Sequence, residues 1–486
     1  MKIVLALLVG VALSGCSLIP KFEQPAVDIP AQYKELGAEE RGSWKEAQPA
    51  DALARGEWWK IFHDPLLDEL ALQAVNANQN LKSAAARVAQ SRALLGVTAA
   101  DRYPQGTVGF GPTRSHPSAV SQGLLDGTDT KPVTIWRAPL TVSYEVDLFG
   151  RVSSNVAAAR NDLAASEALY RSVLLSLQAD VAQAYFNLRA TDAELGVLRE
   201  TVRTREENVR LLQRRFDLGD IGELDLARAK TELSTTRTDA IGLERQRAQL
   251  EHGLAVLLGK PPASFALAPA PLAADVPRVP AGLPSALLER RPDIAAAQRR
   301  MIATNARIGV ARSAFFPSLN LTGQAGFESN ELSNLFNWSS RAWVLGPLFG
   351  TILSMPVFDG GRNRANLTRS WAALDESVAD YRQNVLIAFA EVEDNLAGLR
   401  VLSGQFESIQ DSLGSARRAL RLADIRYRAG ATSYLDVIDA QRGVLSIRRL
   451  EVQIAGARAA STVALIRALG GGWDAPVVQA EATRDD

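Results

Sequence analysis

The chain has 486 residues, enough for two or three ordinary domains or for one body built from repeats. Its 54 Lys and Arg residues balance 54 Asp and Glu residues, so it lacks the broad basic field of a nucleic-acid-binding protein. Three histidines and one cysteine are too few for a typical zinc or iron–sulfur site and allow no internal disulfide, so we expect no metal and no cofactor.

The first residues have the pattern of a secretory signal. Lys2 is followed by an apolar run over residues 3–13 and then by small residues before the single cysteine, Cys16. The run is shorter than the roughly 20 residues of a spanning helix, and no later uninterrupted apolar run is long enough. Any membrane crossing by the mature chain would therefore use strands closed into a barrel.

Leu13-Ser14-Gly15-Cys16 resembles the end of a bacterial lipoprotein signal. The resemblance implies cleavage before Cys16 and acylation of Cys16 with fatty acids such as palmitate. It also implies sorting to the outer membrane, because the residue after the cysteine is Ser17 and not an aspartate. The alternative is an ordinary signal peptide with an incidental cysteine.

An internal duplication organises the rest of the chain. Arg215-Phe216-x-x-Gly219 recurs 211 positions later as Arg426-Tyr427-x-x-Gly430. Three more pairs share this offset: Leu224-Asp225-Leu226 with Leu435-Asp436-Val437, Gly150-Arg151 with Gly361-Arg362, and Leu258-Gly259 with Leu469-Gly470. We therefore predict two structural repeats, each with two strands, a very long helix, a turn and a return helix.

The long helices are predicted over residues 151–218 and 362–429, which contain no proline and are rich in Ala, Leu, Arg and Glu. Each would span on the order of 100 Å. Each ends at a glycine, Gly219 or Gly430, suited to a left-handed C-cap, before a second helix returns to Leu258 or Leu469. Helices this long need partners along their length, as in a coiled coil or a bundle.

Alternating polar and apolar residues precede each long helix. Residues 136–146 alternate over the length of a tilted outer-membrane strand, with Trp136 and Tyr144 as candidate interfacial residues. Residues 319–327 alternate in the same way, residues 343–358 do so less cleanly around Pro347, and residues 105–111 are the weakest candidate. Because four strands cannot close a barrel, the barrel hypothesis requires an oligomer, of two or three chains.

Several motifs, in this order, resemble the outer-membrane factors of tripartite efflux pumps and type I export systems, in particular the TolC-like lipoprotein branch. They are Trp58-Trp59-x-x-Phe62-x-Asp64-Pro65-x-Leu67, Ser143-Tyr144-Glu145-Val146-Asp147-Leu148-Phe149-Gly150-Arg151, Arg290-Arg291-Pro292-Asp293-Ile294, Pro356-Val357-Phe358-Asp359-Gly360-Gly361-Arg362, and Tyr427-Arg428-Ala429-Gly430 with Tyr434-Leu435-Asp436-Val437.

The resemblance implies an α+β membrane protein of the outer membrane. Three chains would form a homotrimer, with four strands per chain in a twelve-stranded β-barrel that continues into a long α-helical barrel across the periplasm. An inner-membrane pump and a periplasmic adaptor would be its partners, and its role would be a passive exit duct for drugs or other small molecules. The alternative is a lipid-anchored periplasmic helical adaptor.

The chain is accordingly expected to divide into six segments. They are a signal peptide (1–15), a lipid-anchored N-terminal segment (16–60), a first repeat (61–260), a Pro-rich linker (261–289), a second repeat (290–471) and a disordered tail (472–486).

Gating is expected at the turns around Gly219 and Gly430, farthest from the barrel. In the family, acidic side chains just inside the second-repeat turn constrict the pore, and Asp436 and Asp439 match them on one helix face. Three copies would form two carboxylate rings that favour cations. The alternative is a pair of solvated surface acids.

The family also closes the turns with polar ties that involve an aromatic residue, here Tyr427. Its better-known basic site falls on Thr432, so Arg428 or Arg426 would have to supply the tie in this chain. Their expected partners in the first-repeat turn are Asp217, Asp220 and Glu223.

An enzymatic role is not expected. The sequence has no His-Glu-x-x-His and no Gly-x-Ser-x-Gly motif. Gly259-Lys260 is followed by Pro261, which rules out the helix start of a phosphate-binding loop.

Replacing both Asp436 and Asp439 with Asn is expected to reduce cation selectivity, because the proposed rings would lose their negative charge. Reversal potentials in planar bilayers measure this selectivity. Unchanged potentials would contradict the two rings.

Overall fold

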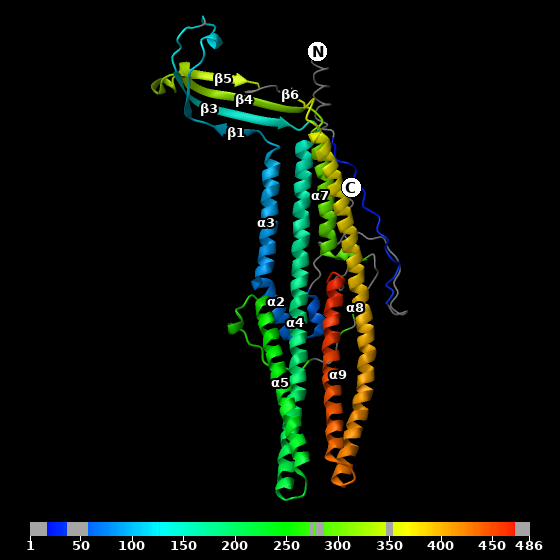
Figure 1. The fold of residues 1–486 in the computed structure, drawn as a ribbon. Helices are drawn as coiled ribbons and strands as arrows, with labels where there is room; N and C mark the ends of the chain where they lie inside the picture. The colour runs from blue at the N-terminus through cyan, green and yellow to red at the C-terminus, as the bar shows by residue number, and fades with distance from the viewer. Residues whose placement is uncertain are drawn as a thin grey trace, which may run out of the picture. The chain divides into compact units, whose positions relative to one another are not determined.

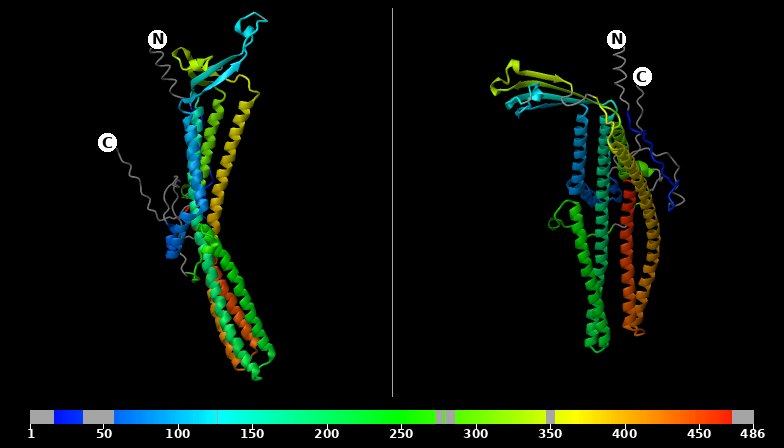
Figure 2. Two further views of the ribbon diagram at one scale, coloured as in Figure 1. Left: turned by 90° about the vertical axis from the view of Figure 1, so that its left-hand side faces the viewer. Right: turned by 45° about the horizontal axis from the view of Figure 1, so that its top comes forward.

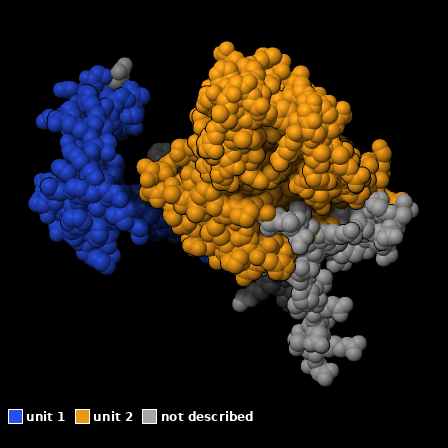
Figure 3. Space-filling view, turned by 90° about the horizontal axis from the view of Figure 1, so that it is seen from below, with its two compact units in different colours: residues 1–26, 87–166, 296–381 blue, residues 27–86, 167–295, 382–486 orange. Residues whose placement is uncertain are grey.

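The computed structural model describes residues 17–35, 57–125, 127–272, 277, 279, 286–346 and 353–471. Cys16, the expected signal peptide and the expected tail lie outside the described residues. The chain divides into two compact units, coloured separately in Figure 3. Unit 1 comprises Met1–Ala26, Arg87–Ser166 and Ala296–Tyr381, and unit 2 comprises Val27–Ala86, Glu167–Ala295 and Arg382–Asp486.

The helices confirm the predicted duplication. The long helices α4 (Arg151–Asp217) and α8 (Arg362–Arg428) both have 67 residues, and the return helices α5 (Glu223–Leu257) and α9 (Tyr434–Ala468) both have 35. The two shorter helices α3 (Gln79–Ala100) and α7 (Pro292–Ser313) have 22 residues each. Figure 1 shows α4 turning into α5 and α8 turning into α9.

Glycine ends both long helices in the same way. Gly219 and Gly430 have φ angles of 74° and 71°. Beyond them, the amide of Asp220 donates to the carbonyl of Arg215 (2.8 Å) and that of Ala431 to Arg426 (2.9 Å). These are the contacts of a Schellman motif, in which a residue without a side chain adopts the left-handed conformation, so the predicted C-caps are confirmed.

An aspartate precedes the start of each long helix. The Asp147 carboxylate accepts from the amides of Val152 (2.9 Å) and Ser153 (2.7 Å). The Asp359 carboxylate accepts from Gly361 and Asn363, both at 2.9 Å. These bonds satisfy amides that lack a partner within the helix.

The described residues contain two further α-helices, α2 (Pro65–Ala77) and the short α6 (Ala286–Arg290). The Asp64 carboxylate caps α2 by accepting from the amides of Leu66 and Leu67. No helix in the described part of the chain combines the length and the apolar character needed to cross a membrane.

Unit 1 contains one antiparallel sheet, visible in Figure 1 and in both views of Figure 2. Its strands are β1 (Gln105–Val108), β2 (Gly111–Ser115), β3 (Val133–Val146), β4 (Ser318–Ser329), β5 (Arg341–Leu345) and β6 (Leu353–Ser354). β1 and β2 both pair with β3, and β5 and β6 both pair with β4, so the six segments occupy the four predicted strand positions.

The first outer strand position is interrupted. Between β1 and β2, the Gly109 amide donates to the Pro139 carbonyl of β3 at 2.9 Å. Between β5 and β6, residues 347–352, which include Pro347, lie outside the described residues. The central pair is continuous, from Trp136 opposite Ser329 to Val146 opposite Leu319.

One face of the sheet presents an apolar surface. Leu140, Val142 and Tyr144 of β3 stand opposite Ala325, Gly323 and Leu321 of β4. Trp343 and Leu345 of β5 extend the same surface, and Trp343 is 71% exposed. The predicted alternation therefore forms a continuous apolar face that is open to the surroundings in the single chain.

Unit 2 has a core made by helices from both repeats. Apolar side chains of α2, α4, α5 and α9 pack together in one cluster, which includes Leu67, Phe186, Leu254, Val463 and Ile466. The aromatic rings of Phe62 and Phe186 lie 4.7 Å apart within it. This core supplies the lateral packing that helices of such length require.

The first part of the expected linker is fixed by charged side chains of α4 and α5. Asp192, with its side chain 1% exposed, pairs with Arg189 (3.1 Å) and Arg247 (2.6 Å). Arg189 donates to the Ala268 carbonyl (2.8 Å), and the Leu267 amide donates to Glu251 (2.6 Å). These contacts hold the chain that follows α5 against α4 and α5.

Gly326 of β4 lies too close to β3 to accept a side chain. A Cβ at this position would stand 2.2 Å from the Ala138 carbonyl oxygen, whereas one at Gly323 would meet its nearest atom, Leu345 Cδ2, at 3.5 Å. Gly326→Ala should lower thermal stability by about 1–3 kcal/mol through overpacking. Circular dichroism in detergent checks this, with Gly323→Ala as the matched control, and equal midpoints for the two variants would contradict the close approach.

Candidate functional site

The two helix turns lie together in unit 2. Residues 218–222 connect α4 to α5, and residues 429–433 connect α8 to α9. Above them, side chains of three helices form an apolar cluster, here called the tip cluster: Leu212, Leu226, Ala229, Tyr434, Val437 and Ile438. The ends of both repeats are thus packed against each other, at the lower end of Figure 1.

Tyr427 is tied to the first repeat by Arg215. The Arg215 guanidinium donates from Nη1 to the Tyr427 hydroxyl (3.1 Å) and stands over its ring, 5.7 Å from the centroid. Its Nε donates to Asp220 at 2.8 Å. One arginine therefore joins the second-repeat tyrosine to an acid of the first-repeat turn, in a charge-assisted contact.

Burial makes the two tyrosines of this region harder to ionise. The Tyr427 and Tyr434 rings pack 5.3 Å apart. Desolvation raises the pKa of Tyr427 and raises that of Tyr434 to about 12. Tyr427 therefore accepts from Arg215 as an uncharged hydroxyl at neutral pH.

The expected ties through Arg428 and Arg426 are not formed within the chain. Arg428 pairs instead with Asp424 one turn earlier on α8, at 2.9 Å. Arg426 has no ion pair in the described residues. Asp217 accepts a hydrogen bond from Gln213 on its own helix (2.9 Å). Glu223 lies in the first turn of α5, where the helix dipole favours an acidic side chain. Of the expected acids, Asp220 alone takes part in the tie.

The internal duplication is the sequence feature that could have identified Arg215 as a partner of Tyr427. Arg215 stands 211 positions before Arg426, so the repeat-equivalent arginine forms the tie. Within one chain the arginine that contacts Tyr427 therefore comes from the first repeat, because the two copies of the motif cannot be told apart before their helices are packed. Ties of Arg426 or Arg428 between chains stay a prediction.

Asp436 and Asp439 are both exposed on α9, as expected for residues three apart. Asp439 Oδ1 lies 3.4 Å from Arg442 Nη1, and its side chain is 59% exposed. Asp436 has no ion pair among the described residues. The structure of one chain thus leaves both carboxylates available to solvent or to another copy of the chain.

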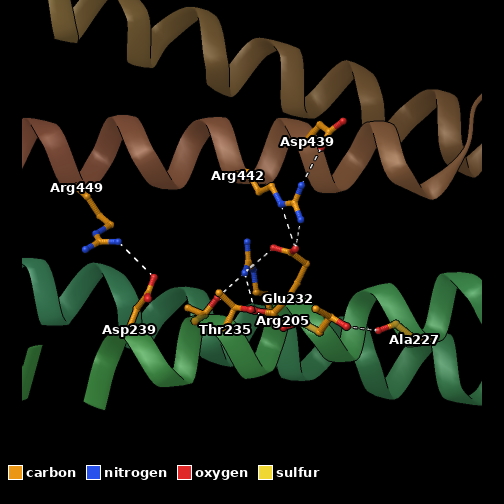
Figure 4. A network of polar contacts seen from close by, with 10 residues as sticks. Arg205, Ala227, Glu232, Thr235, Asp239, Asp439, Arg442 and Arg449 are labelled. Atoms are coloured by element: carbon orange, nitrogen blue, oxygen red, sulfur yellow. Dashed lines mark hydrogen bonds and ion pairs between the residues drawn. The ribbon is translucent and has the colours of Figure 1, made fainter. Parts of the chain in front are cut away.

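Asp439 belongs to a polar network that extends from α9 to α5 and α4 (Figure 4). Arg442 of α9 also pairs with Glu232 of α5, whose other oxygen is 3.0 Å from Nη1 of the buried Arg205 on α4. Burial lowers the pKa of the Arg205 guanidinium, and Glu232 opposes this by favouring the charged form. Asp439 is therefore linked through Arg442 to both helices of the first repeat.

The segment after Cys16 is fixed along α7. Asn305 donates to the Pro20 carbonyl (2.9 Å), and Gln298 to the Gln24 side chain (3.1 Å). A Cβ at Gly309 would approach Ile19 to 2.8 Å, so glycine allows the close packing. Cys16 itself lies outside the described residues. Within those residues, no three His, Cys, Asp or Glu side chains gather as a metal site would require.

Comparison with known proteins matches both repeats. Residues 70–260 and 283–471 match the family described as outer membrane efflux protein. The toluene efflux pump outer membrane protein TtgF of Pseudomonas putida is 35% identical over 478 residues, 97% of each chain. The cation efflux system protein CusC of Escherichia coli is 34% identical over 469 residues, 96% of this chain and 98% of CusC.

Solved structures of outer-membrane channels have the same fold. The outer-membrane channel OprN superposes with a TM-score of 0.84 at 30% identity, covering 94% of this chain and 100% of OprN. The CmeC outer membrane channel of Campylobacter jejuni superposes with a TM-score of 0.85 at 26% identity, covering 94% and 95% of the two chains.

If the Arg215–Tyr427 contact restrains the turns, the double variant Arg215→Ser, Tyr427→Phe should raise single-channel conductance, because it removes both the hydrogen bond and the ion pair with Asp220. Planar-bilayer recording measures this. Arg428→Ser is the matched control, since it removes an arginine of the second-repeat turn that pairs only within its own helix. An increase in conductance in the Arg428→Ser variant alone would show that Arg428, and not Arg215, restrains the turns.

Proposed function

Because the chain belongs to the outer membrane efflux protein family, we propose that it is the passive exit duct of a three-component export system. It is an outer-membrane channel protein of the efflux class. The observation that carries the proposal is the combination, within each repeat, of strands with an open apolar face and a long helical hairpin that ends in a restrained turn. Such a chain can join a membrane-embedded part to a tunnel.

We infer that the working unit is a homotrimer. One chain supplies four strand positions, too few for closure, and three chains supply twelve. In a closed barrel the apolar face formed by Leu140, Val142, Tyr144 and Trp343 would meet lipid. Closure also removes the unpaired edges that an open sheet would expose in a membrane.

The turns form the gate in this proposal. Arg215 and Tyr427 hold the two hairpins of one chain together, and three copies of Asp436 and Asp439 would narrow the opening with two rings of carboxylates. Such rings attract cations and resist close approach through mutual repulsion. Opening then requires the polar ties to break, which costs little for exposed contacts.

Acylated Cys16 is the proposed lipid anchor. The contacts of residues 17–24 with α7 support this, because they would fix the attachment point relative to the rest of unit 1. The chain would then be attached to the membrane in two ways, by the acyl groups on Cys16 and by its strands.

A periplasmic adaptor and an inner-membrane pump are the proposed partners, and no nucleic acid takes part. The relatives are named for the efflux of toluene, of cations and of antibiotics, which share no common chemistry. We infer that the duct does not select its cargo and that the pump does. Transport, without catalysis, is therefore the proposed activity.

A lipid-anchored helical adaptor is the competing proposal, and the two differ in their behaviour without the lipid. As a duct, the Cys16→Ala chain should still require detergent and should retain channel conductance after purification, because the strands alone cross the membrane. Heat-modifiable trimer bands on gels, with and without boiling, provide the second measurement. A Cys16→Ala chain that is monomeric and stable without detergent would favour the adaptor.

A further inference from the structure

Exposed arginines gather on the two long helices within unit 2. Residues 203–214 of α4 and 417–421 of α8 contain seven arginines and two acids, in a chain whose charges balance overall. Six of these arginines are exposed, and their side chains make no hydrogen bond or ion pair within the described residues: Arg203, Arg210, Arg214, Arg417, Arg418 and Arg421. Like charges at this density repel one another unless a partner neutralises them.

Glu200 places arginines of α4 and α8 on the same side of unit 2. Its carboxylate accepts a hydrogen bond from Arg448 of α9 at 2.9 Å. This bond, and after it the charges of Arg203 on α4 and Arg417 on α8, hold the pKa of the Glu200 carboxyl below its usual value. Three guanidinium groups from three helices therefore act on one carboxylate, and the local charge stays positive.

From this point two rows of arginines continue toward the turns. Arg210 and Arg214 follow Arg203 at seven and eleven positions, so the three lie on one face of α4. Arg421 follows Arg417 at four positions on α8. Side chains of α8 pack against the tip cluster, to which α4 contributes, so the two rows run along neighbouring helices. These five arginines are here called the basic face, which extends about 16 Å along α4.

The two acids of these residues do not neutralise the basic face. Glu206 is turned to α5, where it pairs with Arg237 at 2.6 Å. Glu207 lies in the α4 row, four positions after Arg203, and has no ion pair among the described residues. One carboxylate thus stands among five guanidinium groups, and the surface keeps a positive charge.

The internal duplication does not account for this charge. The 211-residue offset makes Arg417 and Arg418 of α8 equivalent to Glu206 and Glu207 of α4. The two repeats therefore carry opposite charges at this level of their long helices. With the charges of the first repeat in both places, the α8 row would be acidic at its start, so the basic face depends on residues particular to α8.

Rows of guanidinium groups on neighbouring helices fit a helix that carries carboxylates. A guanidinium binds a carboxylate through two parallel hydrogen bonds, which makes the contact directional as well as charged. Acids three or four positions apart on a helix recur about every 5–6 Å, the interval at which arginines recur within each row. An acidic helix laid along the basic face could therefore meet several arginines at once.

We propose that the basic face binds an acidic helical segment of the periplasmic adaptor, and that its charge determines which adaptors this duct accepts. The proposal rests on the three-component export system proposed above and adds the chemistry of one partner. An adaptor with basic residues in that segment is rejected, because like charges brought together cost more than a missing contact.

Photo-crosslinking in cells tests the proposal. Leu211, which is 58% exposed and lies between Arg210 and Arg214, is replaced by the photoreactive residue p-benzoylphenylalanine in the full chain. Irradiation should link it to a periplasmic protein. Mass spectrometry of the linked peptide should then show Asp or Glu residues at intervals of three or four.

Charge reversal on the other helix tests whether the arginines make the contact. Arg417→Glu together with Arg421→Glu should lower the yield of this crosslink about tenfold. Arg245→Glu is the matched control, because Arg245 is an exposed arginine of α5 that lies outside the basic face and has no ion pair among the described residues. Replacing two acids of the linked peptide with Arg should restore the yield with the double variant.

Several results would overturn the proposal. They are a crosslink that persists at full yield in the double variant, a linked peptide without acids, and a crosslink to cell-wall polymer, to lipid or to another copy of the chain. The absence of any crosslink would overturn it as well, because the basic face would then have no partner.

Failure of the underlying function has a different signature. A purified trimer of the unchanged chain without conductance in planar bilayers would contradict the duct, whatever the crosslinks show. The double variant should conduct as the unchanged chain does, because Arg417 and Arg421 take no part in the proposed gate. A crosslink lost with conductance retained therefore reports on the basic face and not on misfolding.

Discussion

The fold depends on one requirement: a helix of 67 residues is stable only when neighbours cover it along its length. Within unit 2, α4 meets this requirement with α2, α5 and α9, whose apolar side chains share one core. Toward the turns that core gives way to smaller clusters and to ion pairs. The packing of unit 2 therefore changes along the same helices, from one large apolar core to smaller apolar clusters with ion pairs between them.

The two repeats have the same lengths but different internal contacts. Helices α4 and α5 are joined by Arg199–Glu244 (2.9 Å) and Arg237–Glu206 (2.6 Å), among other pairs. The described contacts between α8 and α9 include a hydrogen bond from the Gln410 amide to Glu451 (2.6 Å) and the Arg458 guanidinium over the Phe406 ring, whereas Arg442, Arg448 and Arg449 of α9 pair with acids of the first repeat. Divergence after duplication has thus joined α9 to the other repeat through its charges.

The sequence predicted the helices and strands well, because their signals are local. Proline-free segments that end at Gly219 and Gly430 determine the helix limits, and alternation in residues 136–146 identifies the central strand. The partner of Tyr427 was missed because it depends on which helices pack together: Arg215 and Arg426 occupy equivalent positions, and only the packed turns distinguish them. The pairing of Asp192 on α4 with Arg247 on α5 likewise joins residues far apart in sequence.

The equal lengths of corresponding helices restrict how such a chain can change during evolution. One residue inserted into α4 would rotate everything beyond it by about 100° and shift the turn by about 1.5 Å. Arg215 would then no longer point at Tyr427, and the arginines of α9 would face different side chains. An insertion or deletion in one hairpin would therefore need a matching change in the other to keep these contacts.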